Sequence, residues 1–151
     1  MQKITPFLWF DNNAEEAMQH YVSIFKNSRI VSRTPGPGGS LLVGSFELEG
    51  QSFTALNGGP IFKFTEAISL AVDCHSQAEV DELWERLCEG GAPSQCGWLK
   101  DRFGLSWQIV PRAMIEMLQD PDPAKAGRTM QAMMKMGKID IAALQRAHRG
   151  E

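Results

Sequence analysis

The side chains of this sequence that could contact a ligand are mostly amides, hydroxyls and aromatic rings in strand-like segments. The segment KDRFGLSWQIV, residues 100–110, reads as a turn followed by a strand. In that strand Gln108 alternates with Trp107 and Ile109, so the glutamine occupies the opposite face from two large apolar residues. A glutamine at such a position is a metal ligand, a substrate contact or a hydrogen-bonded core amide.

Histidine, cysteine and glycine form no recognisable catalytic or cofactor-binding pattern. The three histidines, His20, His75 and His148, are scattered, and a three-histidine metal site is therefore not expected. The three cysteines, Cys74, Cys88 and Cys96, are 14 and 8 residues apart, spacings that match no zinc motif, so we predict free thiols. The stretch PGPGGS is followed by a strand rather than a helix, which predicts a hairpin loop and not a phosphate-binding loop.

A unit of one strand, one helix and several further strands occurs twice before Pro111. The strands predicted for the first unit are 4–10, 29–34, 41–48 and 51–57, and those for the second are 68–74, 93–98 and 106–110. A further short strand is considered at 99–101. The two helices are predicted to begin after Asn13 and Ser76, each of which precedes a glutamate by three residues, as in a capping box. The caps are 63 residues apart, which indicates an internal duplication.

The strand faces predicted to turn away from the helices mix aromatic, small and amide side chains. The candidates for a ligand cavity on these faces are Thr5, Phe7, Trp9, Phe53, Asn57, Ser69 and Gln108. Trp98 and Phe103 are candidates for its rim. A mainly apolar surface with a few orienting polar groups is typical of a ligand site. The alternative is a filled core between two sheets in which the amides are satisfied.

The composition changes after Pro111. Helices are predicted at 112–119, 123–136 and 140–148, with Asp122 as a cap and Pro123 in the first helical position. Six of the eight methionines lie in this region: Met114, Met117, Met130, Met133, Met134 and Met136. Methionine fills irregular contacts and is common on adaptable surfaces. These residues are predicted to pack back onto the domain, to form a subunit contact, or to do both.

The overall composition favours an ordinary globular protein. Hydrophobic residues make up 43% and charged residues 22% of the 151 residues, and the formal charge is −3. Without a basic surplus we expect no nucleic-acid partner. No run of 18 apolar residues is present, and the segment MQKITPFLWF lacks the pattern of a signal peptide, so we expect a cytoplasmic protein without a membrane partner.

The duplicated unit resembles the vicinal oxygen chelate superfamily, which includes glyoxalase I, extradiol dioxygenases and proteins of bleomycin and fosfomycin resistance. Within it, the sequence is similar to the PhnB-like group, which has carried the label 3-demethylubiquinone-9 3-methyltransferase. The stretches that carry the resemblance are ITPFLWFDNNAEEAMQHYVSIF, FTALNGG, KDRFGLSWQIVP and DPDPAKAGRTMQAMMKMGKIDIAAL. The resemblance implies an α+β fold of two paired βαβββ modules that form a curved mixed sheet with a cleft, plus C-terminal helices, usually as a homodimer. The expected parts are residues 1–60, 61–111 and 112–151 of one compact domain.

The superfamily binds its metal through four cavity-facing ligands. Carried onto this chain by strand position, they fall on Thr5, near Asn57, on Ala67 with Glu66 beside it, and on Gln108. Threonine and alanine cannot replace imidazole or carboxylate ligands, and amide oxygens are weak neutral ligands. We therefore expect no metal and no other cofactor, and no chemistry that depends on a metal. A methyltransferase of the common class is not expected either, because no glycine-rich strand-to-helix turn is present.

The favoured function is metal-free binding of a small, partly aromatic molecule of unknown identity. Two alternatives remain open. One is an enzyme of uncharacterised reaction in which Glu66, Asp73 or Asp101 acts as acid or base. The other is a structural or interaction protein that acts through its methionine-rich C-terminal helices.

Overall fold

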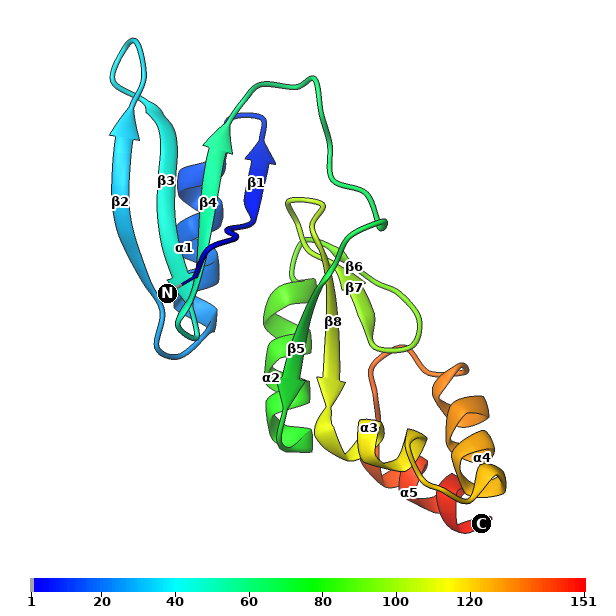
Figure 1. Ribbon diagram of the computed structural model, residues 1–151. Helices are drawn as coiled ribbons and strands as arrows, with labels where there is room; N and C mark the ends of the chain where they lie inside the picture. Colours follow the sequence, from blue (N-terminus) through cyan, green and yellow to red (C-terminus); the bar gives the residue numbers. More distant parts are fainter. Residues whose placement is uncertain (1) are drawn as a thin grey trace. The chain divides into compact units, whose positions relative to one another are not determined.

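The protein consists of two compact units, each built on a four-stranded mixed sheet (Figure 1). The computed structural model describes residues 2–151. The first unit ends at Phe64, and the second runs from Thr65 to Glu151. The α+β class and the repeated strand–helix–strands order are confirmed. The shared cleft stays a prediction.

The first unit has the strand order β1-β4-β3-β2. Its elements are β1 (Phe7–Phe10), α1 (Ala14–Ile24), β2 (Arg29–Pro35), β3 (Leu41–Leu48) and β4 (Gln51–Asn57). β1 runs parallel to β4, and the other pairs are antiparallel. The β3–β4 hairpin turns at Glu49 and Gly50, whose positive φ angles of 49° and 80° are those of a tight two-residue turn. The first strand is shorter than predicted because only residues 7–10 pair with β4.

The core of the first unit lies between α1 and one face of its sheet. Tyr21 of α1 is fully buried and stacks on Phe46 of β3, with 6.3 Å between ring centroids. Phe46 in turn stacks on Phe53 of β4 at 5.4 Å. Gly44 allows the helix to approach, because a Cβ atom there would lie 2.5 Å from the Cε of Met18. This aromatic stack fixes which face of the sheet is covered by the helix.

The second unit repeats this arrangement with shorter strands and adds three helices. Its elements are β5 (Leu70–Cys74), α2 (Gln77–Cys88), β6 (Ala92–Pro93), β7 (Trp98–Lys100), β8 (Ser106–Pro111), α3 (Arg112–Leu118), α4 (Pro123–Met133) and α5 (Ile141–Arg149). The strand order is β5-β8-β7-β6, with β5 parallel to β8. The strand predicted at 93–98 is wrong, because Cys96 and Gly97 have φ angles of 60° and 84° and the chain turns there. The short strand considered at 99–101 corresponds to β7.

Of the two predicted capping boxes, the one at Ser76 is confirmed for its serine, while its glutamate bonds the N–H of the residue before the cap. Ser76 accepts a hydrogen bond from the Glu79 N–H at 3.1 Å, and the Glu79 carboxylate accepts one from the His75 N–H at 2.7 Å. The box predicted at Asn13 is wrong, because the Asn13 side chain makes no capping bond. A residue from a distant strand, Asn57, accepts the N–H at the start of α1 instead.

The C-terminal helices pack onto the second unit through a small apolar core. Its members are Met114, Ile139 and Leu144, with Val110, Met117, Leu118, Ala132, Met133 and Met136 packed around them. Four of the six C-terminal methionines are therefore used in packing, as one of the two interpretations predicts. Met130 of α4 and Met134, just after its C-terminal end, remain 43% and 61% exposed. Asp122 caps α4 as predicted, accepting the Ala124 N–H at 2.9 Å.

Candidate functional site

The first sheet has one face that α1 does not cover. Leu8 and Phe10 of β1 are buried toward the helix, whereas Phe7 on the opposite face is 64% exposed. The register pairs Phe7 with Thr54 and Trp9 with Leu56. The part of this face around β1, which we call the first helix-free face, comprises Phe7, Trp9, Val43, Ser45, Thr54 and Leu56, and Glu47 and Ser52 lie beyond it toward the β3–β4 turn. It is apolar and aromatic with two hydroxyl groups, a composition typical of a binding surface.

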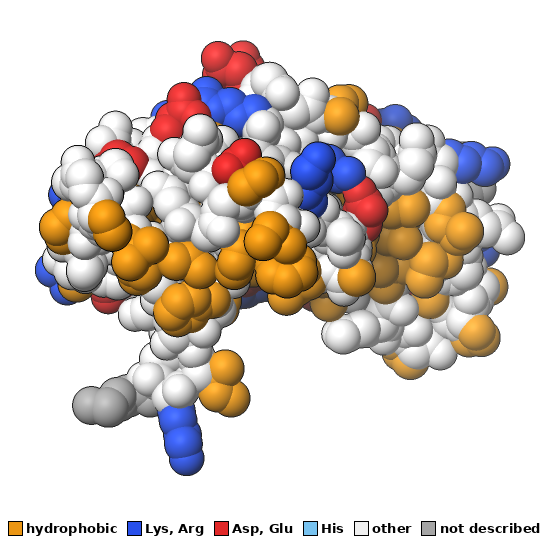
Figure 2. Space-filling view, turned by 90° about the horizontal axis from the view of Figure 1, so that it is seen from above, with side chains coloured by type: hydrophobic (Ala, Val, Ile, Leu, Met, Phe, Trp, Pro, Cys, Tyr) orange, Lys and Arg blue, Asp and Glu red, His pale blue; other side chains and the backbone are white. Residues whose placement is uncertain are grey.

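Trp9 is held in one position on this face. Its indole N–H donates a hydrogen bond of 2.9 Å to the carbonyl of Gly59, and its ring meets Phe62 edge-on at 4.9 Å between centroids. Gly58 leaves room for the ring, since a Cβ atom there would lie only 2.7 Å from the indole Cδ2. Figure 2 shows hydrophobic side chains gathered on one part of the surface. A fixed, partly exposed aromatic ring binds a ligand without first losing side-chain entropy.

Phe53 and Asn57 do not share this face, so their predicted orientation is wrong. Phe53 is buried in the stack with Phe46, and the parallel register places Asn57 beside Phe10 on the helix side. The Asn57 Oδ1 accepts the Ala14 N–H and its Nδ2 donates to the Leu41 carbonyl, each at 2.9 Å. Asn57 therefore joins the start of α1 to β3 and has a structural role. Thr5 lies before β1 and is exposed.

The second sheet also has a face that α2 does not cover. Leu99, Trp107 and Ile109 are buried on the helix side. Gln108 pairs in register with Ala71 and Trp98, and its Nε2 donates a 2.9 Å hydrogen bond to the Ser69 Oγ. The part of this face around Gln108, which we call the second helix-free face, comprises Ser69, Ala71, Trp98, Lys100 and Gln108. Val110, farther along β8 on the same side, packs against the C-terminal core. The structure thus brings together Ser69 and Gln108, two of the predicted site residues, and their binding role stays a prediction.

Sequence reasoning missed Lys100, which lies on this face. The sequence predicts residue 100 either at the start of a turn or in a short strand at 99–101, and it is the last residue of β7, on the same side as Trp98, two residues earlier. Its ammonium group forms an ion pair with Glu66. This pairing lowers the pKa of Glu66 below its ordinary value, chiefly through the side-chain hydrogen bond from Lys100. The alternation of Trp98 and Lys100 was the available signal.

Asp101, one of the three candidate acids or bases, is a structural residue. It is 2% exposed, and its carboxylate accepts hydrogen bonds from the backbone N–H groups of Phe103 and Leu105 at 2.9 and 3.0 Å. Its other oxygen accepts the indole N–H of Trp107 at 2.9 Å. These donors tie the β7–β8 turn to the core. Phe103, a predicted rim residue, is half-buried with the Arg102 guanidinium 4.9 Å above its ring.

The other polar candidates are also engaged with neighbouring groups. Asp73 is exposed and pairs with Arg112 at 2.5 Å.

All three cysteines are free thiols, as predicted. Burial raises the pKa of Cys74 to about 12 and also raises the pKa of Cys88, so neither favours a nucleophilic thiolate at neutral pH.

The residues that the superfamily resemblance assigns to a metal do not fit one. Both amide atoms of Asn57 are hydrogen-bonded to the backbone, Glu66 is paired with a lysine, and residue 67 is an alanine with no donor atom. The remaining donors, a threonine hydroxyl and a glutamine amide, are neutral and weak ligands. Within residues 2–151, no group of three or more histidine, cysteine, aspartate and glutamate side chains could hold a metal ion.

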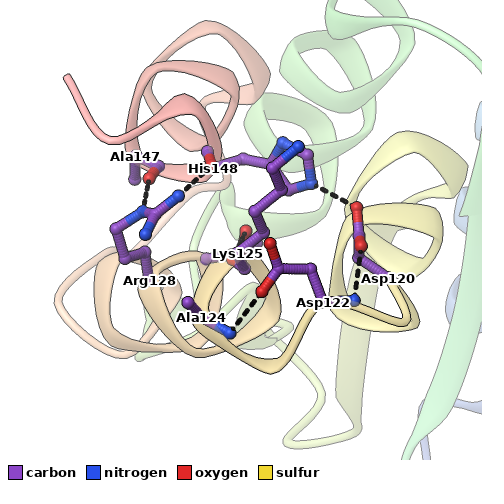
Figure 3. Close-up of polar contacts among 8 residues, drawn as sticks. Asp120, Asp122, Ala124, Lys125, Arg128, Ala147 and His148 are labelled. Carbon is purple, nitrogen blue, oxygen red and sulfur yellow. Dashed lines mark hydrogen bonds and ion pairs between the residues drawn. The ribbon is translucent and has the colours of Figure 1, made fainter.

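A separate polar cluster fixes the C-terminal helices (Figure 3). The His148 ring and the Asp120 carboxylate lie 2.8 Å apart, beside a shallow hollow of about 370 Å³ between α3 and α5. Arg128 of α4 donates to the carbonyl groups of Ala147 and His148 at 3.0 and 2.8 Å, at the C-terminal end of α5. A cation at this end of a helix is favourable for the helix dipole. The cluster therefore has a clear structural role.

We expect the stabilisation from Asp120 to disappear in acid. The Asp122 N–H and the His148 ring lower the pKa of Asp120. Because this pKa is depressed on folding, the stabilisation is present above the pKa of the unfolded chain, about 4, and is lost as pH falls through the folded-state pKa. Urea unfolding should therefore show Asp120→Asn to be less stable than the wild type at pH 7 and nearly equal to it at acidic pH. Glu116→Gln, in the same hollow, serves as the control. A difference for Asp120→Asn that persists unchanged into strong acid would contradict this expectation.

Comparison with known proteins supports the resemblance inferred from the sequence. A family model described as 3-demethylubiquinone-9 3-methyltransferase matches residues 2–110. The structure of the PhnB protein from Bacillus cereus is similar at 36% identity and a TM-score of 0.69, covering 73% of this chain and 99% of that one. The fosfomycin resistance protein FosX from Listeria monocytogenes is similar at 17% identity and a TM-score of 0.57, covering 79% and 98% of the two chains.

A glyoxylase/bleomycin resistance protein/dioxygenase domain from Frankia has 16% identity and a TM-score of 0.50, over 74% of this chain and 92% of that one. At these low identities, the Listeria and Frankia proteins show the shared fold alone. The family match ends before the C-terminal helices, although the sequence of those helices contributed to the resemblance. The search of curated proteins found no match. No helix within residues 2–151 is long and apolar enough to cross a membrane.

Proposed function

The chain belongs to the family described as 3-demethylubiquinone-9 3-methyltransferase, the PhnB-like group of the vicinal oxygen chelate superfamily, and we propose that it binds a small organic molecule without a metal. The observation that carries this proposal is the fixed Trp9 indole on a sheet face that the helix of its own unit leaves uncovered. Phe7 and Leu56 extend the apolar surface on the same face. The ligand that suits such a surface is small and partly aromatic.

The methyltransferase description does not carry over to the chemistry proposed. Each sheet contains a single parallel strand pair, and the connections into α1 and α2, residues 11–13 and 75–76, contain no glycine. A glycine-rich turn is what brings the backbone of a nucleotide-binding fold close to its cofactor. Asp101 is saturated by three N–H donors, and Glu66 and Asp73 are each paired with a cation, so the carboxylates give no specific support to the enzyme alternative.

The proposal includes a cytoplasmic homodimer. The exposed methionines Met130, on α4, and Met134, the residue that caps the C-terminal end of α4, are four residues apart and supply apolar area for a subunit contact. Because the neighbouring methionines are used inside the second unit, only these two are available for such a contact. Light scattering over a range of protein concentrations measures the oligomeric state.

Binding is tested with a thermal-shift screen of aromatic and amphipathic metabolites in buffer containing EDTA. We expect hits whose affinity falls about tenfold in Trp9→Ala, because stacking on an aromatic ring and its apolar area together contribute on the order of 1–2 kcal/mol. Trp84→Ala, which removes an indole from α2, is the matched control and should retain the affinity. Hits that bind all three proteins equally, or only when a metal is added, would argue against the proposal.

A further inference from the structure

We propose that the second helix-free face binds a planar, carboxylate-bearing ligand, with Lys100 as its anchor and Glu66 as an internal carboxylate that the ligand displaces. This inference rests on the proposed binding of small organic molecules and adds to it a second site, in the second unit, together with a ligand class. The evidence consists of the side chains that flank Lys100, the exposure of the ion pair and the position of Glu66 in the chain.

Lys100 lies beside the groups that a small aromatic acid requires. It follows Trp98 by two residues on β7, so the two side chains leave the same face of the strand roughly 7 Å apart. Gln108 of β8 lies directly opposite Trp98 in the register. A cation, an aromatic ring and an amide are therefore presented by two adjacent strands. This set matches a carboxylate joined to a ring, with the amide positioned for a further polar group.

The ion pair with Glu66 shows that the ammonium group of Lys100 is positioned to bind a carboxylate. The pair is solvent-exposed, with 63% of the Glu66 side chain and 43% of the Lys100 side chain accessible. Exposed ion pairs of this kind contribute little to stability, so breaking this pair costs little when a second carboxylate replaces the first. Glu66 is a carboxylate at neutral pH, and the hydrogen bond from Lys100 lowers its pKa further.

The two partners differ in how firmly the chain holds them. Lys100 belongs to β7 and is fixed by pairing of that strand with β8. Glu66 lies between β4 and β5, outside any helix or strand. The glutamate can therefore swing away without disturbing the sheet. A second ion pair of the unit, between Asp73 and Arg112, lies near the opposite end of β5 and β8 and supplies a matched control.

The test compares phenylacetate with its neutral analogue phenylacetamide in NMR titrations. We expect the wild type to bind phenylacetate more tightly than phenylacetamide. Glu66→Gln should improve phenylacetate affinity about threefold to fivefold, the range that release of an exposed ion pair allows, and should leave phenylacetamide unchanged. Lys100→Met should remove the preference for the acid. Arg112→Met should behave as the wild type.

The outcomes separate this inference from the proposed function. Equal binding of the acid and the amide, with no effect of Lys100→Met, would overturn the inference and leave small-molecule binding intact. Unchanged phenylacetate affinity in Glu66→Gln would overturn the displacement of Glu66. If inorganic phosphate displaces phenylacetate and binds as tightly as phenylacetate does, the aromatic part of the assignment is overturned. If phenylacetate does not bind while the metabolite screen yields hits, the ligand class is wrong; if neither binds, the proposed function fails as well.

Discussion

Asp101→Ala is expected to destabilise the second unit by roughly 3–5 kcal/mol. The substitution leaves three N–H donors, those of Phe103, Leu105 and the Trp107 indole, without their acceptor in a buried position. Each unsatisfied buried donor costs about 1–3 kcal/mol, reduced where the turn can relax toward water. Urea unfolding followed by circular dichroism measures the loss.

Two further variants make this expectation specific. Asp101→Asn preserves the shape but turns one acceptor into an NH₂ group, so we expect an intermediate loss of about 1–3 kcal/mol. Part of that loss should be recovered when Trp107→Phe removes the opposing indole N–H, a coupling that a double-mutant cycle detects. Asp73→Ala, which removes an exposed carboxylate of the same unit, is the control. A stability of Asp101→Ala within 1 kcal/mol of the wild type would refute the structural role of this residue.

Gly91→Ala is expected to destabilise the protein by about 3 kcal/mol, at the upper end of the range for overpacking. A Cβ atom at residue 91 would meet the Lys100 carbonyl oxygen and lie 2.7 Å from the carbonyl carbon of Asp101. These are backbone atoms, so no side-chain rotation relieves the clash. The short β6–β7 pairing, in which Ala92 faces Lys100, must shift instead.

Gly127→Ala is the matched control for this substitution. Gly127 lies inside α4, and a Cβ atom there has no neighbour within 4 Å. Alanine is a better helix former than glycine, so this variant should be about 0.5–1 kcal/mol more stable than the wild type. Thermal and urea unfolding of both variants measure the contrast. Equal stabilities of Gly91→Ala and Gly127→Ala would show that the backbone around residue 91 accommodates a Cβ atom without loss of stability.

The local features of the fold could be predicted from the sequence because short-range patterns determine them. The bounds of β3 and β4 follow from their apolar alternation and from the Glu49-Gly50 turn, and Ser76 caps α2 through a bond to Glu79, three residues away. The start of α4 is likewise determined by neighbouring residues, because Asp122 caps the helix through the Ala124 N–H and Pro123 occupies its first position. In each case the residues that interact are close in sequence.

The parts of the site that depend on long-range pairing could not be predicted. Alternation shows that Phe53 and Asn57 share a face, but not which face meets α1, because the β1–β4 register joins segments more than 40 residues apart. The capping of α1 by Asn57 and the pairing of Lys100 with Glu66 also join residues that are far apart in sequence. Gln108 and Ser69, both candidates for the ligand cavity, are joined by a hydrogen bond that alternation within single strands does not predict.

Binding of a small molecule to the helix-free faces is tested most directly by the four indole N–H signals in a two-dimensional NMR titration of the metal-free protein with the hits of the screen. Trp9 and Trp98 lie on the helix-free faces, whereas Trp84 is on α2 and the Trp107 indole is bound to buried Asp101. We predict that ligand shifts the signal of Trp9 and leaves those of Trp84 and Trp107 in place, and that carboxylate-bearing ligands also shift the signal of Trp98. Shifts confined to Trp84 or Trp107, or no shift with any compound, would contradict the proposed function.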